Sequence, residues 1–215
     1  MRRFPLAILL AILPAVIATA QAPDTLWTRH VGVNFDVVGE GIDLTDDGGI
    51  IQCGRIYSVR GGRGEYDVLL TKFNDDGVIP WSVSTPNDST EHPRKVVQVA
   101  ENAYAAVGYS EENGSKDFML QYASSAGVDW YEVYDAPNDE EAFDIALTPD
   151  GGFLLVGYRW ISSSEGNLHI LRTDGDGGVV WERDYGIGVQ QRGHTVAVLP
   201  DGDFLVGGDY SGHPT

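Results

Sequence analysis

Cysteine is almost absent from this chain of 215 residues, since Cys53 is the only one. No internal disulfide can therefore form, even in an oxidising compartment. When the repeats described below are aligned, Cys53 takes the place of Val107, Val156 and Val206. We therefore expect a buried thiol that packs as a small hydrophobic side chain, rather than a reactive one.

Basic residues are scarce as well. The chain has 14 Lys and Arg against 32 Asp and Glu, which gives a net charge of −18. If residues 1–22 are removed, Arg2 and Arg3 go with them, and 12 basic residues against 32 acidic ones leave a net charge of −20. Such a surface repels nucleic acid and anionic membranes, so neither is an expected partner. It suits bound cations, or simply solubility.

Long hydrophobic runs are confined to the N-terminus. Met1-Arg2-Arg3 precedes an apolar stretch at 6–18, and small residues between 18 and 22 offer a cleavage site. This pattern is typical of a secretory signal peptide over residues 1–22, and it predicts a secreted or periplasmic product with one repeat domain at 23–215. The stretch is shorter than a typical transmembrane helix, and no later segment of the chain is apolar enough to form one.

Motifs for catalysis are also lacking. The histidines at 30, 92, 169, 194 and 213 fall in no spacing typical of metal ligands, and no serine lies in a nucleophile-elbow context. His169 lies on an alternating strand and is expected to be packed or half-exposed. The pattern favours a protein that is not an enzyme, but it leaves that question open.

The chain does contain an internal repeat. Trp27, Trp81, Trp130 and Trp181 recur 54, 49 and 51 residues apart, and the sequence between them repeats too. A period near 50 residues indicates one supersecondary unit that is copied along the chain. The units cover about 27–80, 81–129, 130–180 and 181–215, and the last of them is truncated.

Each complete unit is predicted to hold four strands. Alternating apolar segments precede Asp-Gly turns at 47–48, 150–151 and 201–202, where glycine accepts the positive φ of a tight turn. The second strand follows and is expected to end on a glycine in every unit, at 54, 108, 157 and 207. After the third strand, a second turn leads to the tryptophan of strand four, which is expected to pack on the next unit.

Four-stranded units of this length, without helical periodicity, predict an all-β fold: a β-propeller of four-stranded blades. Residues 69–81 and 150–158 resemble secreted bacterial β-propeller repeats of the quinoprotein-like kind, and the likeness covers residues 25–215. The resemblance implies the fold and very little about function. A quinone cofactor would be implied by the resemblance alone, and we find no residues for one.

The predicted ring is incomplete, with about three complete blades and partial first and last ones. Residues 27–31 are predicted to be a fourth strand without preceding strands, and the unit that follows Trp181 lacks a third strand. One interpretation is that the sequence is a fragment of a longer repeat protein. The other is that two copies associate and complete a ring, which would cover the exposed sheet edges.

The turn at 174–181 is the segment that most resembles a metal loop. It is similar to the Asp-box of sialidases, a folding device away from the catalytic site, although aspartate stands at 174 instead of a hydroxyl residue. Turn chemistry, in which side-chain oxygens bond turn amides, is the favoured interpretation. Asp174 and Asp176 also have the spacing of oxygen ligands, so a non-standard Ca²⁺ site is the weaker alternative. An EF-hand is rejected, because Val179 and Tyr185 stand where it needs Gly and Glu.

Candidate binding residues lie where the units differ from one another. The residues that lead into the first strands are Glu40, Arg94, Phe143 and His194, followed by Gly41, Lys95, Asp144 and Thr195. In a propeller they would surround the mouth of the channel, where ligand sites are often found. We expect a binding surface made of Glu40, Arg94, Asp144 and His194, with Glu141 and Arg192 nearby. An ordinary solvated rim is the alternative.

Aromatic side chains after the second strands form another candidate. Trp160 is the one tryptophan off the period, and either a ligand contact or the anchoring of its own loop would explain it.

Two functions are compatible with these residues. The first is an exported, non-catalytic β-propeller that binds protein or carbohydrate. The second is a propeller hydrolase acting on glycans, sialidase-like or another glycosidase, with Glu40 and Asp144 as acid and base. A sialidase-like site would need an arginine cluster, and the entry positions offer two arginines, Arg94 and Arg192.

Overall fold

The computed structural model describes residues 26–32, 36–60, 63–162 and 165–211, and their regular structure is all β-strand. The predicted signal peptide at 1–22 lies outside these residues, and the part of the chain that is described holds no helix able to cross a membrane. The described strands are β1 (Val37–Leu44), β2 (Ile50–Arg60), β3 (Arg63–Phe73), β4 (Trp81–Thr85), β5 (Thr90–Ala100), β6 (Ala103–Glu112), β7 (Ser115–Ser124), β8 (Gly127–Tyr134), β9 (Glu140–Leu147), β10 (Phe153–Ser162), β11 (Glu165–Thr173), β12 (Val179–Tyr185), β13 (Gln190–Val198) and β14 (Phe204–Ser211).

These strands form three four-stranded antiparallel sheets and one two-stranded sheet. The first sheet is β1–β4, the second β5–β8, the third β9–β12 and the fourth β13–β14, so each sheet is a meander of consecutive strands. The prediction of an all-β chain built from four-stranded units is therefore confirmed. In the fourth sheet, the described residues supply the first two strands of the unit.

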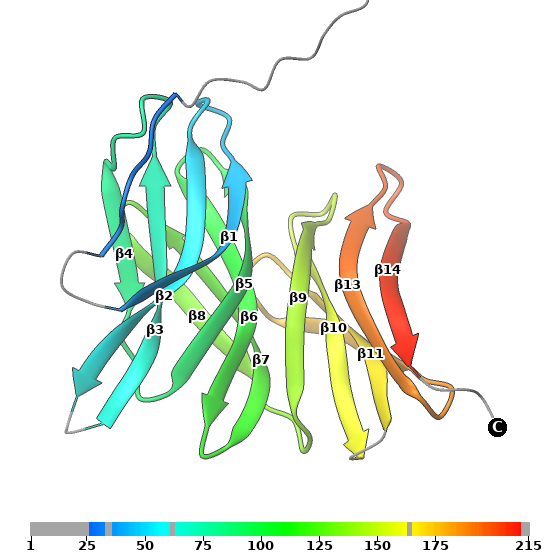
Figure 1. Cartoon of the computed structure of the whole chain (residues 1–215). Coiled ribbons are helices and arrows are strands. Elements are labelled where there is room, and N and C mark those ends of the chain that lie inside the picture. The colour runs from blue at the N-terminus through cyan, green and yellow to red at the C-terminus, as the bar shows by residue number, and fades with distance from the viewer. Residues whose placement is uncertain (1–25, 33–35, 61–62, 163–164, 212–215) are drawn as a thin grey trace, which may run out of the picture.

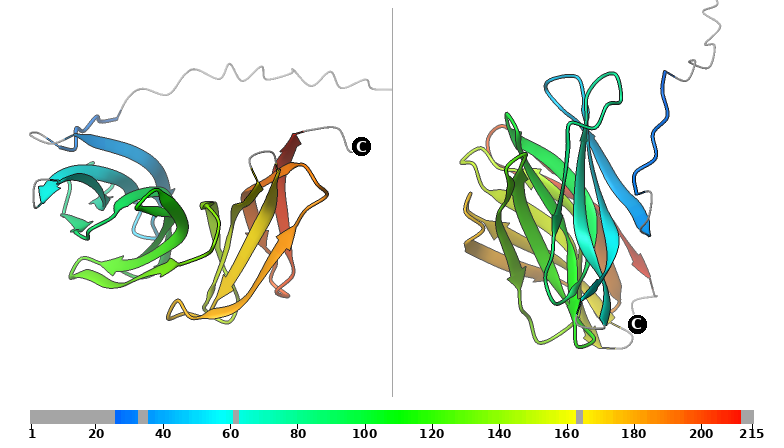
Figure 2. Two further views of the ribbon diagram at one scale, coloured as in Figure 1. Left: turned by 90° about the horizontal axis from the view of Figure 1, so that it is seen from below. Right: turned by 90° about the vertical axis from the view of Figure 1, so that its left-hand side faces the viewer.

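The sheets follow one another in chain order and pack face to face (Figures 1 and 2). Their first strands, β1, β5, β9 and β13, lie next to one another and so form one continuous side of the molecule. This succession of sheets is propeller-like. The described residues do not close it into a ring.

A β-bulge interrupts the first strand of every sheet at the same place. The pairing of β1 with β2 slips between Gly39 and Gly41, so that Glu40 is the extra residue. The same slip occurs in the other sheets, where the extra residues are Arg94, Phe143 and His194. A bulge changes the direction in which the side chain of its extra residue points. The fold therefore presents one irregular residue per sheet along the shared side of first strands.

The glycine of each second strand lies beside this bulge. A Cβ on Gly157 would stand 1.9 Å from the carbonyl oxygen of Glu141, and one on Gly108 would stand 2.0 Å from that of His92. The prediction that the second strand ends at this glycine is wrong, because β6 continues to Glu112 and β10 to Ser162. Glycine is needed for the close approach of two backbones inside the sheet.

The structural register also shifts the alignment of the last unit by one residue. Gly208 pairs with Gly193 beside the fourth bulge, as Gly157 pairs with Ala142 beside the third. Gly207, and not Val206, therefore occupies the place of Cys53. Cys53 itself is fully buried, and burial raises its thiol pKa to about 12, so its prediction as a small packed side chain is confirmed.

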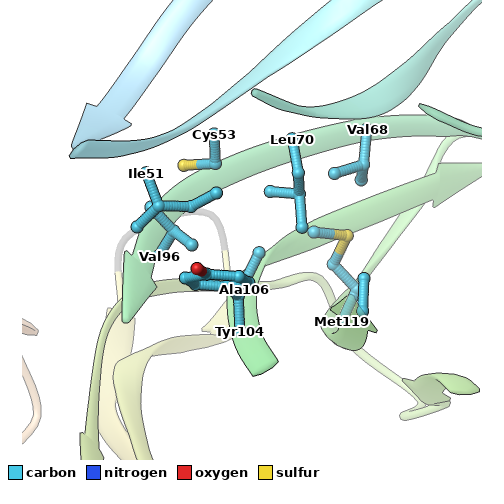
Figure 3. Packing of buried hydrophobic residues seen from close by; sticks show 9 residues of the cluster. Ile51, Cys53, Val68, Leu70, Val96, Tyr104, Ala106 and Met119 are labelled. Carbon is cyan, nitrogen blue, oxygen red and sulfur yellow. The ribbon is translucent and has the colours of Figure 1, made fainter. Parts of the chain in front are cut away.

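The hydrophobic core is a series of layers between successive sheets. Figure 3 shows the first layer, in which Ile51, Cys53 and Leu70 of the first sheet meet Val96 and Met119 of the second. Tryptophans close the outer part of each layer: Trp81 packs on Tyr104, Trp130 on Phe153 and Trp181 on Phe204. The prediction that the aromatic residue at the end of one unit packs on the next unit is confirmed.

Trp27 differs from the other period tryptophans. Residues 26–32 form no strand, so the prediction of an isolated fourth strand is wrong for this segment. The Trp27 ring stacks on Phe73 with centroids 5.9 Å apart, and its indole N–H donates to the carbonyl oxygen of Asp75 at 3.1 Å. Trp27 still covers the outer part of the sheet that follows it, because it packs against Gly77 of the first sheet as Trp130 packs against Gly177 of the third.

Candidate functional site

The four bulged residues form a row across the first strands, which we call the rim. It consists of Glu40, Arg94, Phe143 and His194, one from each sheet. Glu40 and Arg94 are ion-paired at 3.6 Å, and the Phe143 and His194 rings lie 5.2 Å apart. The rim therefore has a charged half over the first two sheets and an aromatic half over the last two.

The charged half is a network of ion pairs. Glu40 also lies 3.6 Å from Arg55, and Arg94 reaches Glu141 at 3.6 Å with its other terminal nitrogen. Lys116 closes the network with a 2.7 Å bond to Glu141. Glu40, Arg94 and Glu141, all expected to belong to one surface, are thus brought together, whereas Arg55 and Lys116 were missed. Arg55 lies on β2 and Lys116 on β7, outside the residues that lead into the first strands, from which the candidates were chosen.

Tyr109 lies beneath this network and packs against its cations. The Arg94 guanidinium stands 5.4 Å and the Lys116 ammonium 4.7 Å from the centre of the Tyr109 ring. His92 stacks on the same ring at 4.4 Å, and its Nδ1 faces the Arg55 guanidinium. Burial, and then the charges of Arg55, Arg94 and Lys116, lower the pKa of His92 to about 4. Neutral His92 can therefore accept a hydrogen bond from Arg55 at Nδ1.

His194 and Asp144 have other partners. His194 is exposed on the aromatic half of the rim, and its Nε2 lies 3.1 Å from Asp209. The Asp144 carboxylate accepts hydrogen bonds from the Thr195 hydroxyl at 3.0 Å and the Val196 amide at 2.8 Å. Asp144 thus ties β9 to β13 between the third and fourth sheets. The four predicted residues do not form one cluster.

Trp160 lies near the end of β10. Its ring packs edge-on against Tyr158 at 5.4 Å, and its backbone N–H donates to the carbonyl oxygen of Asp139 at 2.8 Å. A surface groove of about 470 Å³ is lined by Trp160 together with Pro137, Asn138, Asp139, Ile161 and Ser162. The contacts account for loop anchoring, and the half-buried ring also borders open space.

A second charged cluster lies in the third sheet and was missed by sequence reasoning. We call it the Arg159 cluster: Glu140, Arg159, His169, Glu182 and Asp184. Arg159 bonds Glu140 closely and lies 2.9 Å from both Glu182 and Asp184. These residues come from four strands of one sheet. Glu140 has a counterpart in Glu91 of the second sheet, but the cluster as a set does not recur, so neither spacing nor repetition reveals it.

Burial controls ionisation within the Arg159 cluster. His169 is 1% exposed, its Nδ1 bonds Asp184 at 2.8 Å, and burial followed by the Arg159 charge lowers its pKa. Burial raises the pKa of Glu140, and the bonded guanidinium opposes part of that rise. Next to the cluster runs a groove of about 590 Å³, which Arg159 and Glu182 line. The cluster thus combines a buried acid with an exposed carboxylate at a groove.

The acidic turn before β12 uses its carboxylate internally. Asp174 Oδ1 accepts the amide of Asp176 at 3.0 Å and that of Gly178 at 2.7 Å, as Asn74 Oδ1 accepts the Val78 amide in the first sheet. The expected turn chemistry is confirmed. Within the part of the chain that the structure describes, no three His, Cys, Asp or Glu side chains are grouped to hold a metal ion.

No family model matches the chain, and no curated protein matches it either. Among the solved structures, a similar chain comes from work on the GH130 family of mannoside phosphorylases, which is described as containing glycoside hydrolases that target β-1,2 mannosidic linkages in Candida mannan. The two chains share 11% identity with a TM-score of 0.38, over 80% of this chain and 50% of that one. This chain therefore spans half the length of the structure it matches.

Proposed function

We propose that the chain is an exported, non-catalytic β-propeller module that binds a protein or carbohydrate ligand at the charged half of its rim. Each sheet then corresponds to a blade, and the shared side of first strands faces the propeller channel. The bulge carries this proposal. It occurs at the same position in every sheet, yet it presents four chemically different side chains.

The charges on the rim favour a ligand that carries a carboxylate or another anionic group. Arg55, Arg94 and Lys116 outnumber Glu40 and Glu141 by one charge, within a chain whose net charge is −18. The Arg94 and Lys116 side chains are about 30% exposed, against 18% for Glu40 and 11% for Glu141. An approaching ligand therefore meets cations first, and guanidinium groups bind carboxylates well.

Titration with matched probes tests this function. Isothermal calorimetry would compare an oligogalacturonide, a neutral oligosaccharide of equal length and a glutamate-rich peptide. We expect an acidic probe to bind, and Arg94→Ala to weaken binding by ~10-fold or more. Arg183→Ala is the control, because Arg183 is an exposed arginine on β12, outside the rim. Equal affinity for acidic and neutral probes, or no loss in the Arg94 variant, would refute the rim as the site.

A glycan hydrolase is the second candidate, and the Arg159 cluster is the observation that favours it. A glycosidase uses one carboxylic acid that keeps its proton and one ionised carboxylate. Burial raises the pKa of Glu140 even beside the bonded Arg159, and Glu182 is exposed at the groove. In the expected pair, Glu40 is held by two arginines and Asp144 by β13. Product release from the same glycan panel, abolished by Glu140→Gln, would support this function. Loss in Glu40→Gln would instead place catalysis on the rim.

A further inference from the structure

The two terminal sheets expose apolar side chains that every internal sheet buries. Ile42 on β1 corresponds by register to Val96, Ile145 and Val196, whose exposed fractions are 0%, 3% and 8%. Ile42 itself is 64% exposed. The internal three are covered by the sheet that precedes each of them. We call this side of the first sheet the head face.

The opposite end of the molecule shows the complementary exposure. Leu205 on β14 corresponds by register to Ile51, Ala105 and Leu154, which are at most 1% exposed because the following sheet covers them. Leu205 is 68% exposed, and Leu199 beside the same turn is 41% exposed. We call this side of the fourth sheet the tail face.

Within the chain, a face of the tail kind packs on a face of the head kind at each of the three sheet-to-sheet layers. The exposed head and tail faces are therefore the two halves of an interface that the molecule already makes. From this repetition we infer that a second copy of this chain docks head to tail, with Leu205 and Leu199 of one copy against Ile42 of the other.

The segment around Trp27 covers only part of the head face. Trp27 already covers the outer part of the first sheet, above Phe73 and the turn at Gly77. The inner part stays open as a groove of about 390 Å³ lined by Ile42, Ile50, Val37 and Val31 among others. Between successive sheets of the chain, the first and second strands face one another, so β13 and β14 are the strands expected to meet this open part.

Sedimentation velocity on the whole chain, over a range of concentrations, tests this inference. We expect association that strengthens with added salt, because each copy carries a net charge of −18. Ile42→Glu and Leu205→Glu should each raise the dissociation constant by ~10-fold or more. Val179→Glu is the matched control, since Val179 is an exposed valine on β12 of the third sheet.

Mixing the two variants identifies the mode of association. The Leu205 variant keeps an intact head and the Ile42 variant an intact tail, so their mixture should recover one interface and form a heterodimer. A head-to-head or tail-to-tail dimer would give no such recovery. A chain that stays monomeric at all concentrations and salt levels, or an Ile42 variant that associates as well as the control, would overturn the inference.

Discussion

The two ends of each sheet are built on different principles. At one end, the turns between first and second strands repeat the same chemistry: Asp47 is bonded by Thr45 and by Lys72 of β3, and Asp150 is bonded by Thr148 and Arg172 in the same places. At the other end, the bulges repeat in geometry while their side chains differ. We call the end with these turns the turn end and the end with the bulges the rim end. The turn end keeps the same contacts from sheet to sheet, whereas the rim end keeps its backbone geometry and changes its side chains.

This contrast explains where polar groups can be buried. At the turn end, carboxylates stay exposed and reach inward to a buried cation, as Asp47 does to Lys72 at 2.9 Å. At the rim end, whole acids are buried: Glu91 at the start of β5 is 0% exposed and bonds Ser89 at 2.7 Å. Burial there raises the pKa of Glu91 to about 7. The two ends should therefore respond differently to mutation and to pH.

The largest expected difference concerns glycine. In Gly157→Ala at the rim end, the new Cβ would stand 1.9 Å from the Glu141 carbonyl oxygen, so two paired strands must separate. We expect the free energy of unfolding to fall by at least ~3 kcal/mol. Gly151→Ala at the turn end is the matched control, because its φ of 87° is unfavourable but nothing lies within 4 Å. It should cost only ~1 kcal/mol. Equal urea midpoints for the two variants would contradict the steric role of the bulge glycine.

The same glycine shows how far the sequence could predict the fold. Spacing and alternation located the strands, the turns and the packing of Trp81, Trp130 and Trp181, because each depends on local pattern. The bulges were not predicted, since an extra residue in a strand leaves no mark of its own in composition. Gly54, Gly108 and Gly157 were the available signal, because glycine inside a strand often marks a bulge. Their repetition predicts strand ends instead, whereas the structure places them inside the strands.

The candidate site was predictable to a smaller extent. Glu40, Arg94 and Glu141 follow from their distance before the turn that ends each first strand, which the repeat fixes, although the structure places them inside these strands. Arg55 reaches Glu40 from the paired strand β2, and Lys116 reaches Glu141 from the neighbouring sheet, so these pairings depend on strand register, on sheet packing and on side-chain length. The Arg159 cluster joins four strands of one sheet without any recurrent spacing, and it becomes visible only after the strands are paired.

The second prediction concerns rising pH at the rim end. The pKa of Glu91 is about 7 in the folded chain and near 4.5 when the chain is unfolded. The unfolded state therefore releases this proton first, and stability is lost as pH rises from 4.5 to about 7. Glu91→Gln removes the loss. We expect the difference in the free energy of unfolding, variant minus wild type, to increase by up to ~3 kcal/mol as the pH rises across that window.

Urea titrations at several pH values measure this gain as a difference between variant and wild type. The difference is needed because His92, whose pKa is lowered to about 4, titrates in the same range with the opposite sign. Asp67, Tyr131 and Ser89 face Glu91 and remain in both proteins. Glu111→Gln serves as the control, because Glu111 lies on the adjacent β6 and is only half-buried. A difference that does not change between pH 4.5 and pH 7 would show that Glu91 ionises freely.

The smallest expected effect, of opposite sign, belongs to the turn end. Hydrogen bonds from Thr45, Lys72 and the Gly49 amide lower the pKa of Asp47 to about 2, from 3.8 in the unfolded chain. Stability from this group is thus fully present above pH 3.8 and is lost as pH falls towards 2. Because the Asp47 side chain is 63% exposed, solvent screening limits the contribution to less than ~1 kcal/mol. In urea titrations between pH 5 and pH 2, Asp47→Asn should reduce the loss of unfolding free energy by that amount. Asp46→Asn is the control, because Asp46 is one residue away and outside the Lys72 pair, and it should leave this loss unchanged. If both substitutions had the same effect, net charge and not the Asp47 contacts would govern the loss of stability at low pH, and the proposed difference between the turn end and the rim end would be contradicted.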